Sequence, residues 1–147
     1  MLDAAAQTSP ARGDPPVEAL LRRARNGLQR LAPVQVPAAL DAGAVLIDIR
    51  SDLQRLRDGE LPRAVVVARN VLEWRCDPLS EWRDPGLADV RRRLILICDE
   101  GYQSSLAAAT LQLLGRADAT DVIGGFRGWR AAGMPVLASG ARVRAIR

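Results

Sequence analysis

The chain has 147 residues, 48% of them apolar, which is enough for one globular domain with its own core, and no apolar run is long enough to cross a membrane. Histidine and lysine are both absent, which excludes Cys–His dyads, Ser–His–Asp triads, histidine-ligated metal sites, lysine Schiff bases and the P-loop lysine. The net charge of +4 comes from arginines spread along the chain, and with only 3% aromatic residues we expect no nucleic-acid-binding surface.

The N-terminal segment, residues 1–33, is expected to combine a flexible start with one amphipathic helix. Residues 1–13 are small and polar and lack the apolar core of a signal peptide, so we expect a cytoplasmic protein. Asp14 followed by Pro15 is typical of a helix start, and Pro33 ends the predicted helix.

Within this helix, apolar residues recur at helical spacing, at Val17, Leu20, Leu21, Ala24, Leu28 and Leu31. The arginines fall mostly on the other side, at Arg22, Arg23, Arg25 and Arg30. The pattern favours packing of the helix on the rest of its own domain. The oligomeric state stays open, a dimer formed through this helix included.

Short helices and strands alternate over the next part of the chain. Helices are predicted at residues 36–40 and 51–57, and strands at residues 44–50 and 64–67. The strands are short, largely β-branched apolar runs, which is typical of buried parallel strands. Ser51, with Gln54 three residues later, forms a capping-box pattern at the start of the second helix.

Residues 70–84 predict a long irregular excursion on the surface, because they contain proline and several aspartates. This excursion includes Trp74, Cys76 and Trp82, and a short helix is predicted to follow it at residues 84–91. Two cysteines in the whole chain do not indicate a disulfide framework.

The central segment joins an apolar strand to a helix through a short loop. The strand, residues 94–97, is followed at once by Cys98, and the helix begins at Ser104 and ends at Gly115. Cys98 is therefore predicted to lie at the carboxyl end of a strand, where open α/β sheets bind ligands. The N–H groups at the start of the helix would stabilise a thiolate or a bound anion there.

The last part of the chain predicts one more strand–helix pair. Residues 119–123 are expected to form a strand and residues 126–132 a helix that is anchored in the core by Trp129. Strands that alternate with helices predict an α/β fold with a mostly parallel sheet. Residues 139–147 are expected to be a basic C-terminal tail.

Cys98 has two interpretations when it is considered alone. Free cysteine often behaves as a small buried hydrophobic residue, and it can also be a nucleophile. Gly101 favours the nucleophile, because a glycine-containing turn before a helix can aim successive N–H groups at one centre. Such a cradle would also stabilise a persulfide on Cys98.

Four motifs occur in a fixed order: Asp48-Ile49-Arg50, Asp58-Gly59-Glu60-Leu61-Pro62-Arg63-Ala64, the loop from Cys98 to Ser104, and the segment from Gly124 to Val136. Together they resemble the motifs of the rhodanese-like family of single-domain sulfurtransferases. The resemblance covers residues 34–138. It implies a three-layer α/β sandwich with a five-stranded, mostly parallel sheet flanked by helices, to which the N-terminal helix is an addition.

The resemblance also implies the chemistry: Cys98 carries a sulfane sulfur as a persulfide and passes it to a thiophilic acceptor. The substrate-binding loop would consist of Asp99, Glu100, Gly101, Tyr102, Gln103 and Ser104. Asp48 and Arg50 are expected to support the edge of the sheet near this loop, as a structural ion pair rather than by contact with substrate. Trp74 is a further candidate for support, through closure of the pocket. No metal and no cofactor is implied.

The loop departs from the family pattern in ways that bear on the donor. Gln103 stands where many members have arginine, and Asp99 and Glu100 place two negative charges beside the thiol. We expect these charges to repel thiosulfate, and the loop favours a neutral or cationic donor or a protein persulfide, with a thiol as acceptor.

Two other functions remain as alternatives. A module of the same fold could sense persulfides or bind a protein without turnover. A cysteine-dependent phosphatase would need an arginine six positions after the nucleophile, where this chain has Ser104.

Overall fold

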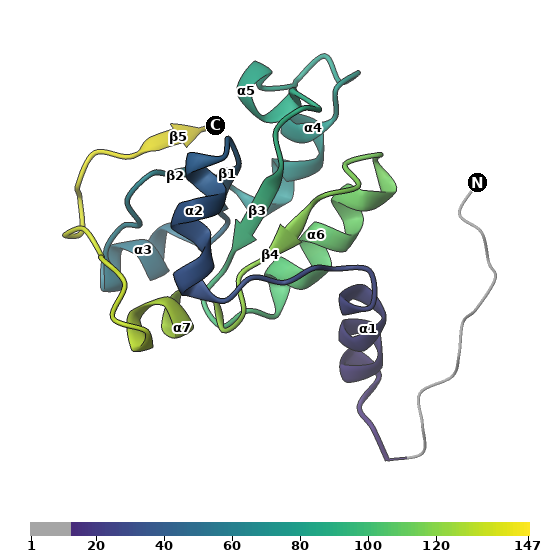
Figure 1. Cartoon of the computed structure of the whole chain (residues 1–147), viewed down its shortest axis with the longest axis horizontal. Coiled ribbons are helices and arrows are strands. Elements are labelled where there is room, and N and C mark those ends of the chain that lie inside the picture. Colours follow the sequence, from purple (N-terminus) through teal and green to yellow (C-terminus); the bar gives the residue numbers. More distant parts are fainter. Residues whose placement is uncertain (1–12) are drawn as a thin grey trace.

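The computed structural model describes residues 13–147, so the predicted flexible start lies outside the described residues except for Gly13. Its centre is a five-stranded sheet in the order β4-β3-β1-β2-β5, and every neighbouring pair of strands is parallel (Figure 1). Helices cover both faces, which gives the α/β architecture that the sequence predicted. Within the described residues, no helix is long and apolar enough to span a membrane.

The strands are β1 (Val45–Asp48), β2 (Ala64–Val67), β3 (Leu94–Ile97), β4 (Thr120–Asp121) and β5 (Arg144–Ile146). Strands β1, β2 and β3 are buried along their whole length, because they lie in the middle of the sheet with helices on both sides. This is why their sequences are continuous apolar runs rather than alternating ones. The predicted strands at 64–67 and 94–97 coincide with β2 and β3.

The helices are α1 (Pro16–Arg25), α2 (Val36–Asp41), α3 (Asp52–Asp58), α4 (Leu72–Cys76), α5 (Pro85–Ala88), α6 (Gln103–Leu113) and α7 (Gly125–Ala131), with 3-10 turns η1 (Pro33–Gln35) and η2 (Arg69–Val71). The capping box at α3 is present: the Gln54 N–H donates to Ser51 Oγ at 3.1 Å, and the Ser51 N–H donates to Gln54 Oε1 at 3.0 Å. The segment predicted to be irregular, residues 70–84, contains α4.

Side chains that alternate along the strands divide the core into two clusters, one on each face of the sheet. On one face, residues such as Ile47 and Leu96 pack with buried residues of α4, α5 and α6. On the other face, residues such as Leu46 and Ile95 pack with buried residues of α2 and α7. Helix α1 lies against α6 and buries Leu21, so it packs on its own domain, as expected (Figure 1).

The first helix is shorter than predicted. It ends at Arg25, and the next residues form an extended linker that contains Gly27, a residue that disfavours helix. Leu31 pairs instead with the sheet beside β4: its N–H donates to the Asp121 carbonyl at 3.0 Å, and its own carbonyl accepts the Ile123 N–H at 2.8 Å. The apolar spacing that suggested a longer helix thus reflects burial of the linker.

The C-terminal segment forms a strand. Residues 139–147 were expected to be a basic tail, but β5 pairs with β2, from Val65 opposite Arg144 to Val67 opposite Ile146. Because β5 is an edge strand with two of its three residues exposed, it lacks the apolar run that marks the central strands.

Candidate active site

Cys98 lies directly after β3, at the carboxyl edge of the sheet and in front of the first turn of α6, as the sequence predicted. Only 6% of the residue is exposed. The start of α7 fixes its backbone: the Phe126 N–H donates to the Cys98 carbonyl at 2.8 Å, and the Arg127 N–H donates to the Asp99 carbonyl at 3.0 Å. The loop therefore lies between α6 and α7 and is held by main-chain hydrogen bonds.

The Cys98 sulfur accepts two backbone N–H groups. The Gly101 nitrogen is 3.2 Å from Sγ and the Ser104 nitrogen is 3.3 Å from it, while the thiol hydrogen is directed at Ser104 Oγ, 3.2 Å away. Gly101 has a φ of +86°, which a side chain would disfavour. Donors that converge on a sulfur in this way stabilise a thiolate or a persulfide there.

A buried polar network supports the loop from behind. Asp121, at the end of β4, is fully buried, and its Oδ2 accepts the hydroxyls of Ser104 and Ser105, each at 2.8 Å. Arg30 pairs with the same carboxylate, with its Nε 2.8 Å from Oδ1. Arg25 and Arg30 also donate to the Gly101 carbonyl, at 2.8 and 3.2 Å.

A pocket of about 410 Å³ opens at Cys98. It is lined by Ile49, Ser51, Gln54, Cys98, Asp99, Glu100, Tyr102 and Gln103. Of the predicted loop residues, Asp99, Glu100, Tyr102 and Gln103 thus lie at the pocket, while Gly101 and Ser104 lie at the sulfur. No sequence pattern indicates that Ile49, Ser51 and Gln54 line the pocket, because their position there depends on how β1 and α3 meet the loop.

Arginines neutralise much of the loop's negative charge. Arg127 Nε lies 3.2 Å from Asp99 Oδ2 and 3.7 Å from Glu100 Oε1, and Arg57 Nη2 lies 3.6 Å from Asp99 Oδ1. The sequence showed the two carboxylates but not these partners, which come from α3 and α7. The expected repulsion of an anionic donor is correspondingly smaller.

The model of the rhodanese-like domain family matches residues 32–132 of this chain, which is more than half of it. The chain belongs to the rhodanese-like family. Two curated relatives are named thiosulfate sulfurtransferase GlpE. One, from Pseudomonas savastanoi pv. phaseolicola, is 33% identical over 103 residues, or 70% of this chain and 88% of that protein. The other, from Pseudomonas syringae pv. syringae, is 33% identical over 102 residues, or 69% and 87%.

Among solved structures, a protein from Rhodopseudomonas palustris described as a possible tyrosine phosphatase is 30% identical with a TM-score of 0.75, and the match covers 86% of this chain and 98% of that one. A rhodanese-like domain from Anabaena is 18% identical with a TM-score of 0.60, and the match covers 80% of this chain and 86% of that one. The second similarity concerns the fold alone. Both match the overall fold of this rhodanese-like domain.

Asp48 and Arg50 form a buried ion pair. Arg50 Nη2 is 2.9 Å from Asp48 Oδ2, and it also donates to the Gly59 carbonyl at 2.9 Å. The guanidinium lies over the Phe126 ring, with its Cζ 4.1 Å from the ring centroid. Neither residue is among the described residues that line the Cys98 pocket. Their placement agrees with a structural role.

The aromatic residues near the loop have different positions. Tyr102 lines the pocket and is 58% exposed. Trp74 and Trp82 are exposed, and neither is among the described residues that line this pocket, so the structure gives no support to its closure by Trp74. Trp129 is buried and donates from Nε1 to the Pro135 carbonyl at 2.9 Å, which anchors α7 as predicted.

Cys76 is fully buried in the core cluster on the α6 face of the sheet. Burial raises the pKa of its thiol to about 12, which keeps it protonated at neutral pH. Within residues 13–147 no cluster of three potential metal ligands occurs.

Proposed function

We propose that this rhodanese-like protein is a sulfurtransferase that moves a sulfane sulfur through a persulfide on Cys98. The observation that carries the proposal is the Cys98 sulfur at the end of β3, with the N–H groups of Gly101 and Ser104 directed at it. The two relatives named thiosulfate sulfurtransferase support the same class of reaction.

The reaction has two displacement steps. In the first, the Cys98 thiolate attacks the sulfane sulfur of a donor, an S–S bond to Cys98 forms, and the donor's bond to that sulfur breaks, so that the leaving group keeps the electron pair. In the second, a thiol or another thiophilic acceptor attacks the outer sulfur, and Cys98 leaves as the thiolate. The N–H groups of Gly101 and Ser104 stabilise the anionic sulfur of each state. No metal or cofactor is required.

The donor that we favour is a neutral or singly charged persulfide, from a small molecule or a protein, rather than thiosulfate. Arg127 pairs with Asp99 and Glu100. Arg57 lies between Asp99 and its closer partner Asp58, which also faces Arg130. Three carboxylates thus face three guanidiniums, so the pocket rim has no excess of positive charge for a dianion.

We therefore expect Glu100→Gln, which removes a half-exposed carboxylate, to raise thiosulfate turnover several-fold, because one repulsive charge is lost. Steady-state thiosulfate kinetics test this, with Glu18→Gln on α1 as the control. An unchanged kcat/KM would contradict the electrostatic argument.

Intact-protein mass spectrometry tests the proposed function. The protein is treated with sulfane-sulfur donors, and its mass is recorded before and after addition of cyanide or a thiol. We expect the addition of one sulfur atom, which the acceptor removes and which is absent from Cys98→Ser but present in Cys76→Ala. No adduct with any donor would overturn the proposal.

The same experiment separates the rival functions. An adduct that no acceptor removes would indicate a persulfide-sensing module. A phosphatase is the second candidate, because the similar protein from Rhodopseudomonas palustris is described as a possible tyrosine phosphatase. Cysteine-dependent phosphatase chemistry needs a guanidinium that binds the phosphoryl oxygens. In this chain Ser104 occupies the loop position six residues after Cys98, where that arginine would stand, and Arg127 is paired with Asp99. We expect no hydrolysis of p-nitrophenyl phosphate that depends on Cys98.

A further inference from the structure

Two arginines from the N-terminal segment reach the Cys98 loop. The family match begins at residue 32, so Arg25, on α1, and Arg30, on the linker, both lie before it. In the sequence pattern they belong to the arginines that fall mostly on the side opposite the apolar residues. The structure places both against the loop, and neither is among the described residues that line the Cys98 pocket.

Arg25 bridges the loop and the first turn of α6. Its Nη2 donates to the Gly101 carbonyl at 2.8 Å, and its Nε donates to Ser105 Oγ at 3.0 Å. Gly101 is the loop residue with the left-handed backbone, and its N–H is one of the two donors to Sγ. A glycine has wide conformational freedom, so an external hold on its carbonyl restricts the direction of this donor.

Arg30 holds the same carbonyl and the buried carboxylate of Asp121. Its Nη2 is 3.2 Å from the Gly101 oxygen, and its Nε is 2.8 Å from Asp121 Oδ1. Asp121 in turn accepts the Ser104 hydroxyl, and the Ser104 N–H is the second donor to Sγ. The negative charge that fixes the start of α6 is therefore neutralised by a residue of the linker. Without that cation the carboxylate would be buried and uncompensated.

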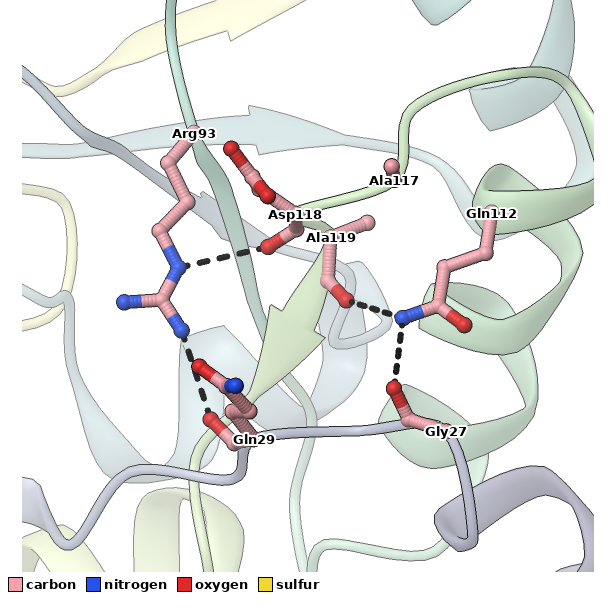
Figure 2. A pocket seen from close by; sticks show the side chains of 7 residues that line it. All are labelled: Gly27, Gln29, Arg93, Gln112, Ala117, Asp118 and Ala119. Atoms are coloured by element: carbon pink, nitrogen blue, oxygen red, sulfur yellow. Dashed lines mark hydrogen bonds between the residues drawn. The ribbon is translucent and has the colours of Figure 1, made fainter.

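The linker itself is anchored, so Arg30 does not depend on α1 alone. Figure 2 shows the cavity of about 290 Å³ at the amino ends of β3 and β4, where two side chains hold the linker backbone. Gln112 Nε2 donates to the carbonyls of Gly27 and Ala119, each at 3.0 Å. Arg93 donates to the backbone carbonyls of Gln29 at 3.4 Å and Asp118 at 3.2 Å. These bonds fix the linker backbone, and they use Gln112 Nε2 and two nitrogens of Arg93 within the protein itself.

We propose that Arg25 and Arg30 are positioning residues for Cys98. By holding the Gly101 carbonyl and Asp121, they keep the N–H groups of Gly101 and Ser104 directed at the sulfur. The N-terminal segment is thus part of the active-site scaffold rather than an appendage. The inference rests on the proposed sulfur transfer for its functional meaning, but the geometry that it describes can be measured at the thiol alone.

The experiment uses three variants: Arg25→Met, Arg25→Lys and a double variant that carries both Arg30→Met and Asp121→Asn. The double variant removes both charges together and so avoids a buried lone carboxylate. Arg22→Met is the matched control, because Arg22 lies on the same helix and its ion pair with Asp14 is exposed. Each protein is assayed for sulfur transfer, for the rate at which iodoacetamide alkylates Cys98, and for its unfolding midpoint.

We expect Arg25→Met and the double variant to lose about tenfold in kcat and in the alkylation rate, the size of effect that follows from losing one charge-assisted hydrogen bond. KM should change little, because neither arginine lines the pocket. Arg25→Lys should recover part of both rates, since an ammonium can still donate to the Gly101 carbonyl. Arg22→Met should behave like the wild type.

Wild-type rates in folded Arg25→Met would overturn the proposal, as would a loss that appears only in the unfolding midpoint. If the double variant does not fold, Arg25→Met and Arg25→Lys decide the matter. If the wild type transfers no sulfur but its Cys98 alkylation falls in Arg25→Met as expected, the proposed function fails and the positioning role stands.

Discussion

Cys76 and Cys98 lie in the same core cluster, and among the described residues only Cys98 has hydrogen-bond donors directed at its sulfur. Cys76 is fully buried, and this burial raises the pKa of its thiol to about 12 although the Arg116 guanidinium lies nearby. Burial therefore makes one thiol inert, while the polar loop makes the other a candidate nucleophile.

We expect iodoacetamide at neutral pH to label Cys98 in the native protein and to leave Cys76 unmodified. Cys76 should be labelled only after unfolding, because its thiol is both inaccessible and protonated in the native state. Peptide mass spectrometry of native and denatured samples makes the comparison. Equal labelling of the two cysteines in the native protein would contradict it.

Gly125 is the second residue-scale constraint on the site. It has a φ of +59°, and a Cβ placed there would lie 2.6 Å from both the Cys98 carbonyl oxygen and the Gly101 nitrogen. The glycine pair of the closing motif thus allows the backbone of the Cys98 loop to contact the start of α7 directly.

We expect Gly125→Ala to lower both stability and the rate of sulfur transfer, because the loop must move away from the new methyl group. The matched control is Gly133→Ala, with a φ of +73° and open space within the described chain around its Cβ. In the control, backbone strain alone should lower the free energy of unfolding by about 1–2 kcal/mol, and the rate of sulfur transfer should stay unchanged. Denaturant unfolding and single-turnover assays measure the two effects. Similar transfer rates in both variants would show that the contact is unimportant.

At the scale of elements, Arg116 joins the end of α6 to the elements before β3. Its buried guanidinium donates to four backbone carbonyls, those of Cys76, Leu87, Asp89 and Arg92. Burial lowers the pKa of this guanidinium, and within the described residues it forms no ion pair. The group thus satisfies the carbonyl ends of α4 and α5, which are too short to be stable alone.

We expect Arg116→Met to destabilise the protein by about 3 kcal/mol or more, because it leaves several buried carbonyls without a donor. Arg116→Lys should recover only part of this, since one ammonium lacks the fork geometry that reaches carbonyls on separate segments. Chemical denaturation gives the values. A loss below about 1 kcal/mol for the methionine variant would mean that water replaces the guanidinium.

In the molecule as a whole, the sheet separates two cores, and one of them contains the buried thiol of Cys76. We expect this thiol to make the stability of the fold depend on pH. In the unfolded chain this thiol ionises from about pH 9, whereas in the folded protein its pKa is about 12. Between these values the unfolded state binds fewer protons than the native state. The free energy of the unfolded state relative to the native state therefore falls as the pH rises.

The unfolding free energy should therefore decrease by up to about 1.4 kcal/mol per pH unit above pH 9 on account of Cys76. Cys76→Ala removes this contribution, so the stability difference between wild type and variant should narrow from pH 8 to pH 10. Denaturation curves at the two pH values provide the test. A constant difference would show that the thiol does not couple to folding.

Local patterns in the amino-acid sequence were enough to predict much of the frame of this protein. The runs at β2 and β3, the capping box of α3, the glycine in the loop and the position of Cys98 before α6 all depend on neighbouring residues, and the structure agrees with them. Four motifs in order also indicated the family, because each is defined within a few residues.

The groups that surround the Cys98 sulfur depend on long-range contacts, which local sequence patterns do not reveal. Arg25 and Arg30 are more than 70 residues from the atoms that they bind, and Arg127 is 28 residues from Asp99. An arginine side chain is long and flexible, and it can cover apolar surface, face solvent or reach a distant carbonyl, so helical periodicity does not reveal its partner. Strand β5 was missed for a related reason: an exposed edge strand is defined by the backbone of β2 and not by its own apolar pattern.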